Sequence, residues 1–179
     1  MKKTQTKQTN PFDRFSTKAL EAIKQSEKKA VERGRGLVGT EELFYGLVSQ
    51  PESLAGEFLK MLKVNLELIK TEISKPVQTK AEYSGFSQLA KSALVDSYQI
   101  AYKFDMTLIS TDLILLALIG NPASDASKLL TRLGYKLTHL FNELEQYIIN
   151  RKLFDQQFSQ IGNQLVAPIG LDKYAINLS

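Results

Sequence analysis

Small and apolar residues in the first part of the chain recur every three or four positions, which is the spacing of an amphipathic helix. One such face lies opposite a face rich in lysine and glutamate, and it consists of Phe15, Ala19, Ala22, Ile23, Ser26 and Ala30. Gly34 and Gly36 follow this segment, and glycine tolerates the left-handed backbone found at helix C-termini. The pattern therefore predicts a long first helix that ends at these glycines.

Three shorter apolar segments come next, and their periodicity predicts helices over about residues 41–49, 54–62 and 65–73. Thr40 is expected to be the N-cap of the first of these helices, where its hydroxyl would accept a hydrogen bond from a free amide. Glu41 and Glu42 then fall in the first helical turn, where the helix dipole favours negative charge.

The second half of the chain repeats the first. A shift of 71 positions places residues 15–73 on residues 86–144 without a gap, and most matched positions are apolar or suited to helix caps. Identical pairs include Phe15/Phe86, Ser16/Ser87, Thr40/Thr111, Leu47/Leu118 and Leu62/Leu133. The run LILLALI at residues 113–119 suits a buried strand as well as a helix. Its counterpart ELFYGLV lies in a helical frame, so a helix is expected in both halves.

These patterns predict an all-α fold of two tandem four-helix repeats, with eight helices and pseudo-twofold symmetry in one compact domain. The first repeat is expected over residues 12–74 and the second over residues 86–150, with residues 75–85 as a short surface linker. The polar residues 1–11 are expected to form a disordered tail. Periodicity fades in residues 151–179, which are expected to be a tail that is ordered only in part.

Composition narrows the possible functions. The 179 residues are 43% hydrophobic, which lets one globular unit bury about 70% of its unfolded surface. The absence of cysteine excludes disulfides, thiolate metal sites and a cysteine nucleophile. The net charge of +4 comes partly from the N-terminal tail and does not indicate a nucleic-acid partner. The longest apolar run has seven residues, whereas a membrane span needs roughly twenty, and no targeting segment is found.

The stretch GRGLVGTEE at residues 34–42 spaces two glycines as a phosphate-binding loop does, but Thr-Glu stands in place of Lys-Ser/Thr. Its counterpart DMTLISTDL has lost all three glycines and has kept Leu-(Val/Ile)-x-Thr-acid. Since the lysine that reaches the phosphates is essential to that chemistry, we expect no ATP binding, no cofactor and no enzyme activity. His139 is the only histidine, and with Glu143 it offers too few ligands for a metal.

Three motifs resemble the N-terminal domain of Clp/Hsp100 proteins of the ClpA and ClpC type, and they are FDRFS at residues 12–16, GTEELFYGL at residues 39–47 and LKVNL at residues 62–66. The resemblance covers about residues 11–150, and the doubling matches the two four-helix repeats of that family. The C-terminal tail also resembles the start of a ClpC linker. The resemblance implies a mobile module that receives substrates and adaptor proteins for an ATPase ring, which threads them into the ClpP peptidase.

The function implied by the resemblance is that of a non-catalytic chaperone or adaptor module that binds client proteins, adaptors, or Clp ATPase and protease subunits. The expected surfaces are shallow and lie near the repeat junction and the second and sixth helices. An alternative is a structural accessory or assembly factor, as in the ClpT type, which associates with the Clp protease core in plastids. Without a transit peptide, the expected location is a bacterial cytoplasm, or the plastid stroma if the chain is plastid-encoded.

A ligand site is also implied by the resemblance. In ClpC-type N-domains the acid of the Gly-Thr-Glu motif of each repeat helps to bind phosphoarginine, a degradation mark. By position, this role falls on Glu41 and Asp112, beside Thr40 and Thr111. A carboxylate at a helix start can pair with a guanidinium group while nearby amides bind phosphate oxygens.

This chain departs from the family pattern at both copies of the motif. Asp112 is one methylene shorter than glutamate, and Ser110 replaces the glycine. The histidine that commonly follows the acid is Glu42 in one copy and Leu113 in the other. Plain helix capping is therefore the alternative for these residues. Tyr45 is expected either in the core or at a protein-binding groove.

Overall fold

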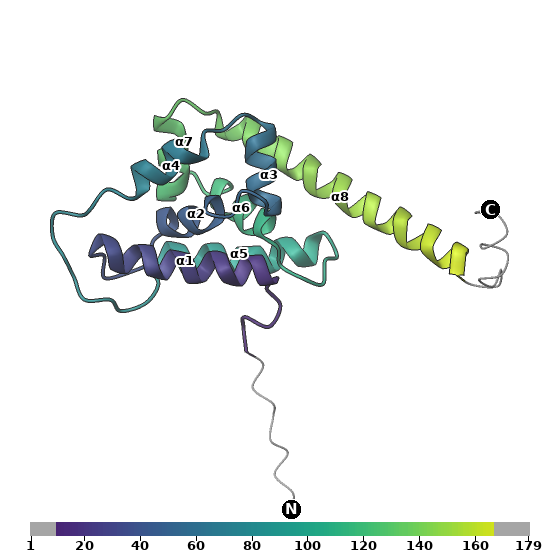
Figure 1. The fold of residues 1–179 in the computed structure, drawn as a ribbon, viewed down its shortest axis with the longest axis horizontal. Coiled ribbons are helices and arrows are strands. Elements are labelled where there is room, and N and C mark those ends of the chain that lie inside the picture. Colours follow the sequence, from purple (N-terminus) through teal and green to yellow (C-terminus); the bar gives the residue numbers. More distant parts are fainter. Residues whose placement is uncertain (1–9, 167–179) are drawn as a thin grey trace, which may run out of the picture. The chain divides into compact units, whose positions relative to one another are not determined.

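The computed structural model describes residues 10–166 of the chain (Figure 1). Its helices are α1 (Thr17–Arg33), α2 (Thr40–Val48), α3 (Leu54–Met61), α4 (Leu66–Ile73), α5 (Gln88–Lys103), α6 (Thr111–Ile119), α7 (Asp125–Arg132) and α8 (Leu137–Val166). Between residues 10 and 166 there is no extended strand, only two isolated β-bridges. The expected all-α class with eight helices is confirmed.

The internal repeat is visible in the helix bounds. α6 begins and ends 71 residues after α2, and α7 begins and ends 71 residues after α3. Ser16 and Ser87 cap α1 and α5 in the same way, because each side chain accepts a hydrogen bond from the amide three residues further on. Residues 113–119 lie within α6, so the prediction of a helix for this apolar run is confirmed.

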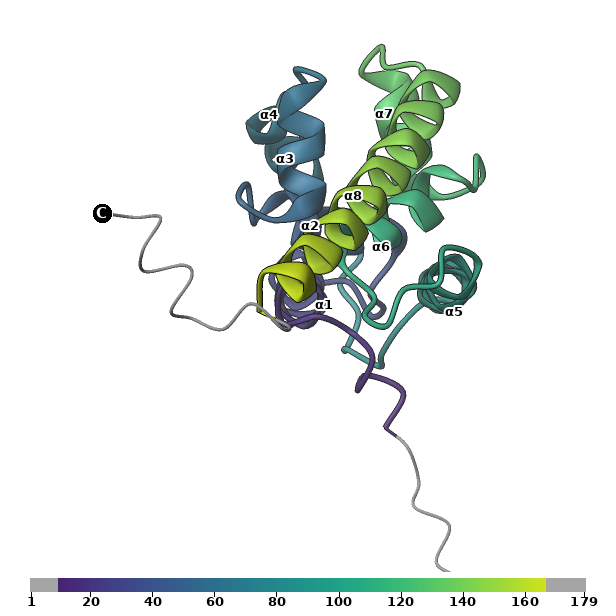
Figure 2. The same ribbon diagram turned by 90° about the vertical axis from the view of Figure 1, so that its right-hand side faces the viewer.

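The chain divides into two units, residues 1–144 and residues 145–179. In the first unit α2 and α6 lie between the α1 and α5 pair and the helices α3, α4 and α7 (Figures 1 and 2). Every residue of α6 is buried, and so are the large side chains of Phe44 in α2 and Phe58 in α3. Full burial of a side chain of this size contributes about 1.5–3 kcal/mol, so α2 and α6 form much of the core of this unit.

Two parallel bridges join the repeats. One pairs Phe15 with Ile109, and the other pairs Val38 with Phe86. A backbone amide donates to the carbonyl oxygen of Ile109 at 2.9 Å in the first bridge and to that of Val38 at 2.8 Å in the second. The 71-residue shift converts one bridge into the other, since 15 becomes 86 and 38 becomes 109. The expected pseudo-twofold relation is therefore present in the backbone contacts.

α1 and α2 approach each other closely at Gly46. A β-carbon at this position would lie 2.0 Å from the carbonyl oxygen of Ala22 in α1, so a larger residue would force the backbones apart. The matching residue in α6 is Ala117. The packing of the first repeat thus depends on a glycine in the middle of a helix.

The segment between α4 and α5 runs along the end of α1. The amide of Ala81 donates to the carbonyl oxygen of Gly34 at 2.9 Å, and the amide of Ser84 donates to that of Gly36 at 2.6 Å. These hydrogen bonds fix the backbone of the loop between α1 and α2, which contains Arg35.

The second unit is described as far as residue 166, where it consists of the continuation of α8. Apolar periodicity fades after residue 150, but the chain continues as a helix as far as Val166, because lysine, arginine, leucine and glutamine in this stretch favour helix. Phe154 and Phe158 stack at helical i, i+4 spacing, with ring centroids 6.1 Å apart. In residues 151–162 the large apolar side chains are exposed, so no contrast between a buried and a solvated face predicts this part of the helix; these side chains are Leu153, Phe154, Phe158 and Ile161.

The remaining statements about the tails fall on residues 1–9 and 167–179, which lie outside the described residues. None of the helices between residues 10 and 166 is long and apolar enough to cross a membrane.

Candidate functional site

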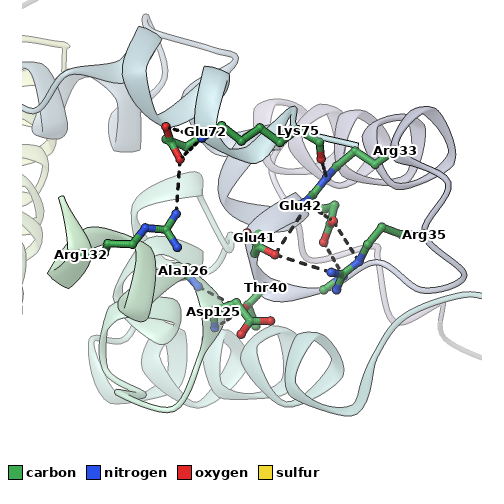
Figure 3. Close-up of polar contacts among 11 residues, drawn as sticks. Arg33, Arg35, Thr40, Glu41, Glu42, Glu72, Lys75, Asp125, Ala126 and Arg132 are labelled. Carbon is green, nitrogen blue, oxygen red and sulfur yellow. Dashed lines mark hydrogen bonds and ion pairs between the residues drawn. The ribbon is translucent and has the colours of Figure 1, made fainter. Parts of the chain in front are cut away.

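α1 ends at Arg33, directly before the stretch GRGLVGTEE, and α2 begins at Thr40 within it. Gly34 adopts the left-handed backbone conformation, with φ 77°, and ends α1, while Gly39 is the N-cap of α2. The turn brings four charged side chains together, and Figure 3 shows them facing one another. We call this set the charge cluster, and its members are Arg33, Arg35, Glu41 and Glu42.

The buried half of the charge cluster is the pair Arg33–Glu42. Arg33 Nη1 lies 2.6 Å from Glu42 Oε1, and Arg33 Nε donates to the carbonyl oxygen of Lys75 at 2.9 Å. Glu42 Oε2 accepts a hydrogen bond from the amide of Gly39 at 2.9 Å. The side chains of Arg33 and Glu42 are 8% and 0% exposed. Both charges are thus desolvated and hydrogen-bonded, as a buried ion pair must be to persist.

The second half of the charge cluster is looser. Arg35 Nε lies 3.3 Å from Glu42 Oε1, and Arg35 Nη1 lies 3.7 Å from Glu41 Oε1. Glu41 Oε1 is also 3.7 Å from Arg33 Nη1. The side chains of Arg35 and Glu41 are 29% and 21% exposed, so this half of the cluster reaches the surface.

Glu41 is the least satisfied member of the charge cluster. Burial raises the pKa of its carboxyl group above the usual range, the positive charge of Arg33 opposes this shift, and the carboxylate of Glu42 adds to it. Within residues 10–166 its carboxylate has ion pairs at 3.7 Å but accepts no hydrogen bond. A half-buried carboxylate with unused lone pairs can accept further N–H donors.

The prediction that Thr40 and Thr111 are N-caps of their own helices is wrong. The N-caps of α2 and α6 are Gly39 and Ser110. The hydroxyl of Thr40 instead accepts hydrogen bonds from the amides of Asp125 and Ala126, the first residues of α7, at 2.8 and 3.3 Å (Figure 3).

Thr111 makes the equivalent contact from the second repeat to the first. Its hydroxyl accepts a hydrogen bond from the amide of Ala55, in the first turn of α3, at 3.0 Å. Both threonines are buried. Each threonine therefore satisfies a free amide, as expected, but at a helix of the other repeat.

The second copy of the motif has a different chemistry. Asp112 is fully buried, and its carboxylate accepts hydrogen bonds from the hydroxyl of Ser110 and the amide of Leu113. The positions that match Arg33, Arg35 and Glu42 hold apolar residues, which are Phe104, Met106 and Leu113. The two acids expected to act alike therefore differ, since Glu41 is partly accessible and Asp112 is not.

Arg33 and Arg35 are not among the residues expected at a site from the sequence, although Arg-Gly-Arg precedes Glu-Glu within ten residues of the chain. The feature of the sequence that could have revealed them is a pair of arginines before the predicted turn and a pair of glutamates after it, and it occurs only in the first repeat. Periodicity and caps, which both repeats share, do not reveal it.

The other candidate residues lie apart from the charge cluster. His139 and Glu143 are exposed on α8, and no group of acids and histidines between residues 10 and 166 could hold a metal ion. Tyr45 is half-buried, with Lys29 Nζ 4.4 Å from its ring centroid, and both line a polar hollow of about 80 Å³. This contact is a cation–π pair and contains no catalytic arrangement.

The described helices form a double four-helix repeat whose two copies are joined by reciprocal bridges. Residues 14–133 match the family model of the Clp repeat (R) N-terminal domain. The chain therefore belongs to the Clp N-terminal domain family, whose members are the substrate- and adaptor-binding domains of Clp ATPases.

Curated relatives agree with this assignment. The ATP-binding subunit ClpA homolog of the Clp protease of Guillardia theta is 30% identical over 131 residues, which are 71% of this chain and 16% of that protein. The chloroplastic chaperone ClpC of Pisum sativum is 27% identical over 133 residues, 72% of this chain and 14% of that protein. The chain spans about a sixth of the length of these relatives.

Solved structures show the same fold. The ClpV N-domain in complex with a VipB peptide has a TM-score of 0.63 at 18% identity, over 77% of this chain and 89% of that one. The N-terminal domain of ClpD from Arabidopsis thaliana has a TM-score of 0.59 at 22% identity, over 78% of this chain and 97% of that one.

Proposed function

We propose that this chain is a non-catalytic Clp-type chaperone or adaptor module that binds client proteins, adaptors, or Clp ATPase and protease subunits. The observation that carries the proposal is the family match over residues 14–133, which spans α1 to α7. The complex of a ClpV N-domain with a VipB peptide gives a precedent for peptide binding by this fold.

The binding surface includes the first turn of α2, where Glu41 is partly exposed beside the repeat junction. Glu41 is the acid that would face a guanidinium or phosphoarginine group of a ligand. Thr40 belongs to the same predicted site, and Thr111 and Asp112 form its counterpart in the second repeat. We assign all three a supporting role because they are buried and hydrogen-bonded.

The chain itself has neither ATP binding nor catalysis in this proposal. The glycines of GRGLVGTEE end α1 and cap α2, and no lysine follows them to reach a phosphate. The chloroplastic ClpC relative favours a plastid stroma as the location, and a bacterial cytoplasm is the alternative.

Two measurements on the full chain test this function. Equimolar protein should slow the aggregation of a heat-labile client in the absence of ATP, as followed by light scattering. A pull-down from native lysate should recover Clp ATPase or protease subunits or a spread of clients. No slowing at a severalfold excess, together with no Clp subunit or client in the pull-down, would refute the proposal.

The pull-down also separates the alternative role. A ClpT-like accessory or assembly factor would recover one dominant stable partner and would not slow client aggregation. Glu41→Gln tests the contribution of the charge cluster. Glu57→Gln is its matched control, because Glu57 is an exposed glutamate in the first turn of α3.

A further inference from the structure

An apolar stripe lies on the surface of α8 beyond residue 150. It consists of Phe154, Phe158 and Ile161, whose exposed fractions are 65%, 67% and 51%. The two phenylalanine rings stack with their centroids 6.1 Å apart and their planes 20° apart, so each ring restricts the rotamers of the other. Aromatic side chains are enriched at protein–protein interfaces, and an exposed group of them indicates a surface that binds a partner.

The spacing of the apolar stripe matches one kind of partner, which is a second α-helix. Together with Arg151, the residues of the stripe follow one another at intervals of three, four and three positions. These are the intervals between positions a and d of a coiled-coil heptad, where each side chain packs between side chains of a facing helix. With Phe158 at position a, Phe154 and Ile161 are at position d. An extended peptide has a side-chain period of two and would not follow this stripe.

The apolar stripe is complementary to a second copy of itself when the two helices run in opposite directions. In an antiparallel pair centred on residue 156, Phe154 of each copy faces Phe158 of the other. Arg151 of each copy then faces Ile161 of the other, and its aliphatic stem can pack there while its charge stays near Asp155 of its own helix, at 3.9 Å. A parallel pair would instead bring the two Arg151 side chains together at position a, where like charges repel.

Charge and area determine how strong such a pair is. Residues 145–162 contain two acidic and two basic side chains, so two copies do not repel each other through net charge; these are Glu145, Asp155, Arg151 and Lys152. A fully buried phenylalanine removes 150–250 Å² from water, so the four partly exposed rings of a pair would bury about 400–600 Å². Stable complexes bury roughly 1,200–2,000 Å², and the pair is therefore weak and depends on concentration.

We propose that the apolar stripe of α8 is a self-association surface, through which two copies of the chain form a weak antiparallel helix pair. The dimer carries the binding surface of the proposed function twice. A ligand with two binding segments is then held by both copies, which raises its apparent affinity without any new contact to the ligand.

The first test is sedimentation equilibrium of the full chain at concentrations up to millimolar. The weight-average mass should rise from 20.1 kDa toward twice that value. Phe158→Ala should weaken the association about tenfold or more, because it removes a ring from the centre of the interface.

Leu153→Ala is the matched control for this test. Leu153 is also an exposed apolar residue of α8, but it lies about 100° around the helix from Phe154 and therefore outside the stripe. The substitution should change the association by less than about twofold. Alanine favours helix, so neither variant loses association through unfolding of α8, and circular dichroism checks the helix content of both.

Cysteine cross-linking tests the antiparallel orientation, because the chain contains no cysteine of its own. Gln157→Cys and Asn150→Cys each place a thiol at position g, in successive heptads. At a rise of 1.5 Å per residue, the two thiols at position 157 of an antiparallel pair are about 3 Å apart along the axis, and those at position 150 are about 18 Å apart. Oxidation should therefore cross-link the Gln157→Cys variant only.

Three outcomes would overturn the inference. These are a mass of 20.1 kDa at every concentration, an equal loss of association in Leu153→Ala and Phe158→Ala, and equal cross-linking of the two cysteine variants. If the chain stays monomeric while Phe158→Ala prevents the capture of Clp subunits, the stripe binds another protein and the inference fails. A monomeric chain that still captures Clp subunits or slows client aggregation leaves the proposed function standing.

Discussion

Tyr98 in α5 has a buried hydroxyl that finds no hydrogen-bond partner in the part of the chain described here. Its ring packs edge-on against Phe15, with centroids 5.4 Å apart. The residue 71 positions earlier is Glu27, which accepts a hydrogen bond from the hydroxyl of Tyr83 at 2.7 Å. The side-chain polar group at this position of the repeat thus has a hydrogen-bond partner in the first copy, and none among the described residues in the second.

Tyr98→Phe should raise the free energy of unfolding by about 1 kcal/mol, because it removes a desolvated hydroxyl and keeps the ring packing. Tyr83→Phe is the control, and it should lower stability by up to about 1 kcal/mol through loss of the bond to Glu27. Urea denaturation measures both changes. A destabilising Tyr98→Phe would mean that the hydroxyl has a partner after all.

Glu41 gives a prediction about pH. Its folded-state pKa is raised by burial, so the folded chain binds this proton more tightly than the unfolded chain. The contribution of this group to the free energy of unfolding is complete below the ordinary glutamate pKa. It is lost as pH rises through the raised pKa of the folded state. Glu41→Gln should therefore unfold at higher urea concentration than the parent at pH 7, with the difference vanishing near pH 3. A lower midpoint at pH 7 would contradict this.

At the residue scale the sequence revealed the acids and threonines of the motif but not their contacts. Ser16 and Ser87 cap helices with their own amides three residues away, a local relation that sequence shows directly. Thr40 bonds to amides 85 and 86 residues away, and only the tertiary fold specifies such a pair.

At the element scale, the turns before α2 and α6 solve one packing problem in two ways. The first uses the ionic Arg33, Arg35 and Glu42, and the second uses the apolar Phe104, Met106 and Leu113. Replacing a buried ion network by apolar residues is often neutral or stabilising, whereas removing one partner leaves an uncompensated charge. The second repeat thus supplies the design for a test on the first.

Glu42→Leu alone should cost about 3–5 kcal/mol, because it leaves Arg33 buried without its carboxylate. The triple variant Arg33→Phe, Arg35→Met, Glu42→Leu copies the second repeat and should recover most of that loss. Chemical denaturation of the two variants gives the comparison. If the triple variant were no more stable than Glu42→Leu, the two turns would not be interchangeable.

The contact of α1 with α2 also gives a prediction. Gly46→Ala should destabilise the chain by about 1–3 kcal/mol, because the added methyl group meets the Ala22 carbonyl and the backbones must separate. Gly162→Ala in α8 is the matched control. It has no neighbour within 4 Å, so it should not lower stability. The thermal unfolding midpoint distinguishes the two outcomes.

The helices of both repeats could be predicted because apolar periodicity reflects burial, and the counterpart in the first repeat decided the ambiguous run at residues 113–119. The end of α8 could not, because its exposed Phe154 and Phe158 leave no contrast between a buried and a solvated face. The charge cluster could not be predicted either, because two charged residues on each side of a turn usually indicate a solvated loop.

On the scale of the first unit, hydrogen bonds of two threonines join the repeats. Thr40 in α2 accepts from an amide of α7, and Thr111 in α6 accepts from an amide of α3. Thr40→Ala should cost about 1–2 kcal/mol, as loss of a helix cap does. It should also speed hydrogen exchange at the amides of Asp125 and Ala126, far away in sequence. Thr40→Ser keeps the hydroxyl and is the control. Unchanged exchange in α7 would show that the cap is dispensable.

The reciprocal bridges give each repeat the same relation to the other that two identical subunits have across a twofold axis, an isologous contact. A true twofold dimer must change both copies of a surface at once, because one gene encodes both. In this chain each copy has its own codons. The turn before α2 therefore carries the charge cluster while the turn before α6 is apolar, a difference that two identical subunits encoded by one gene could not have.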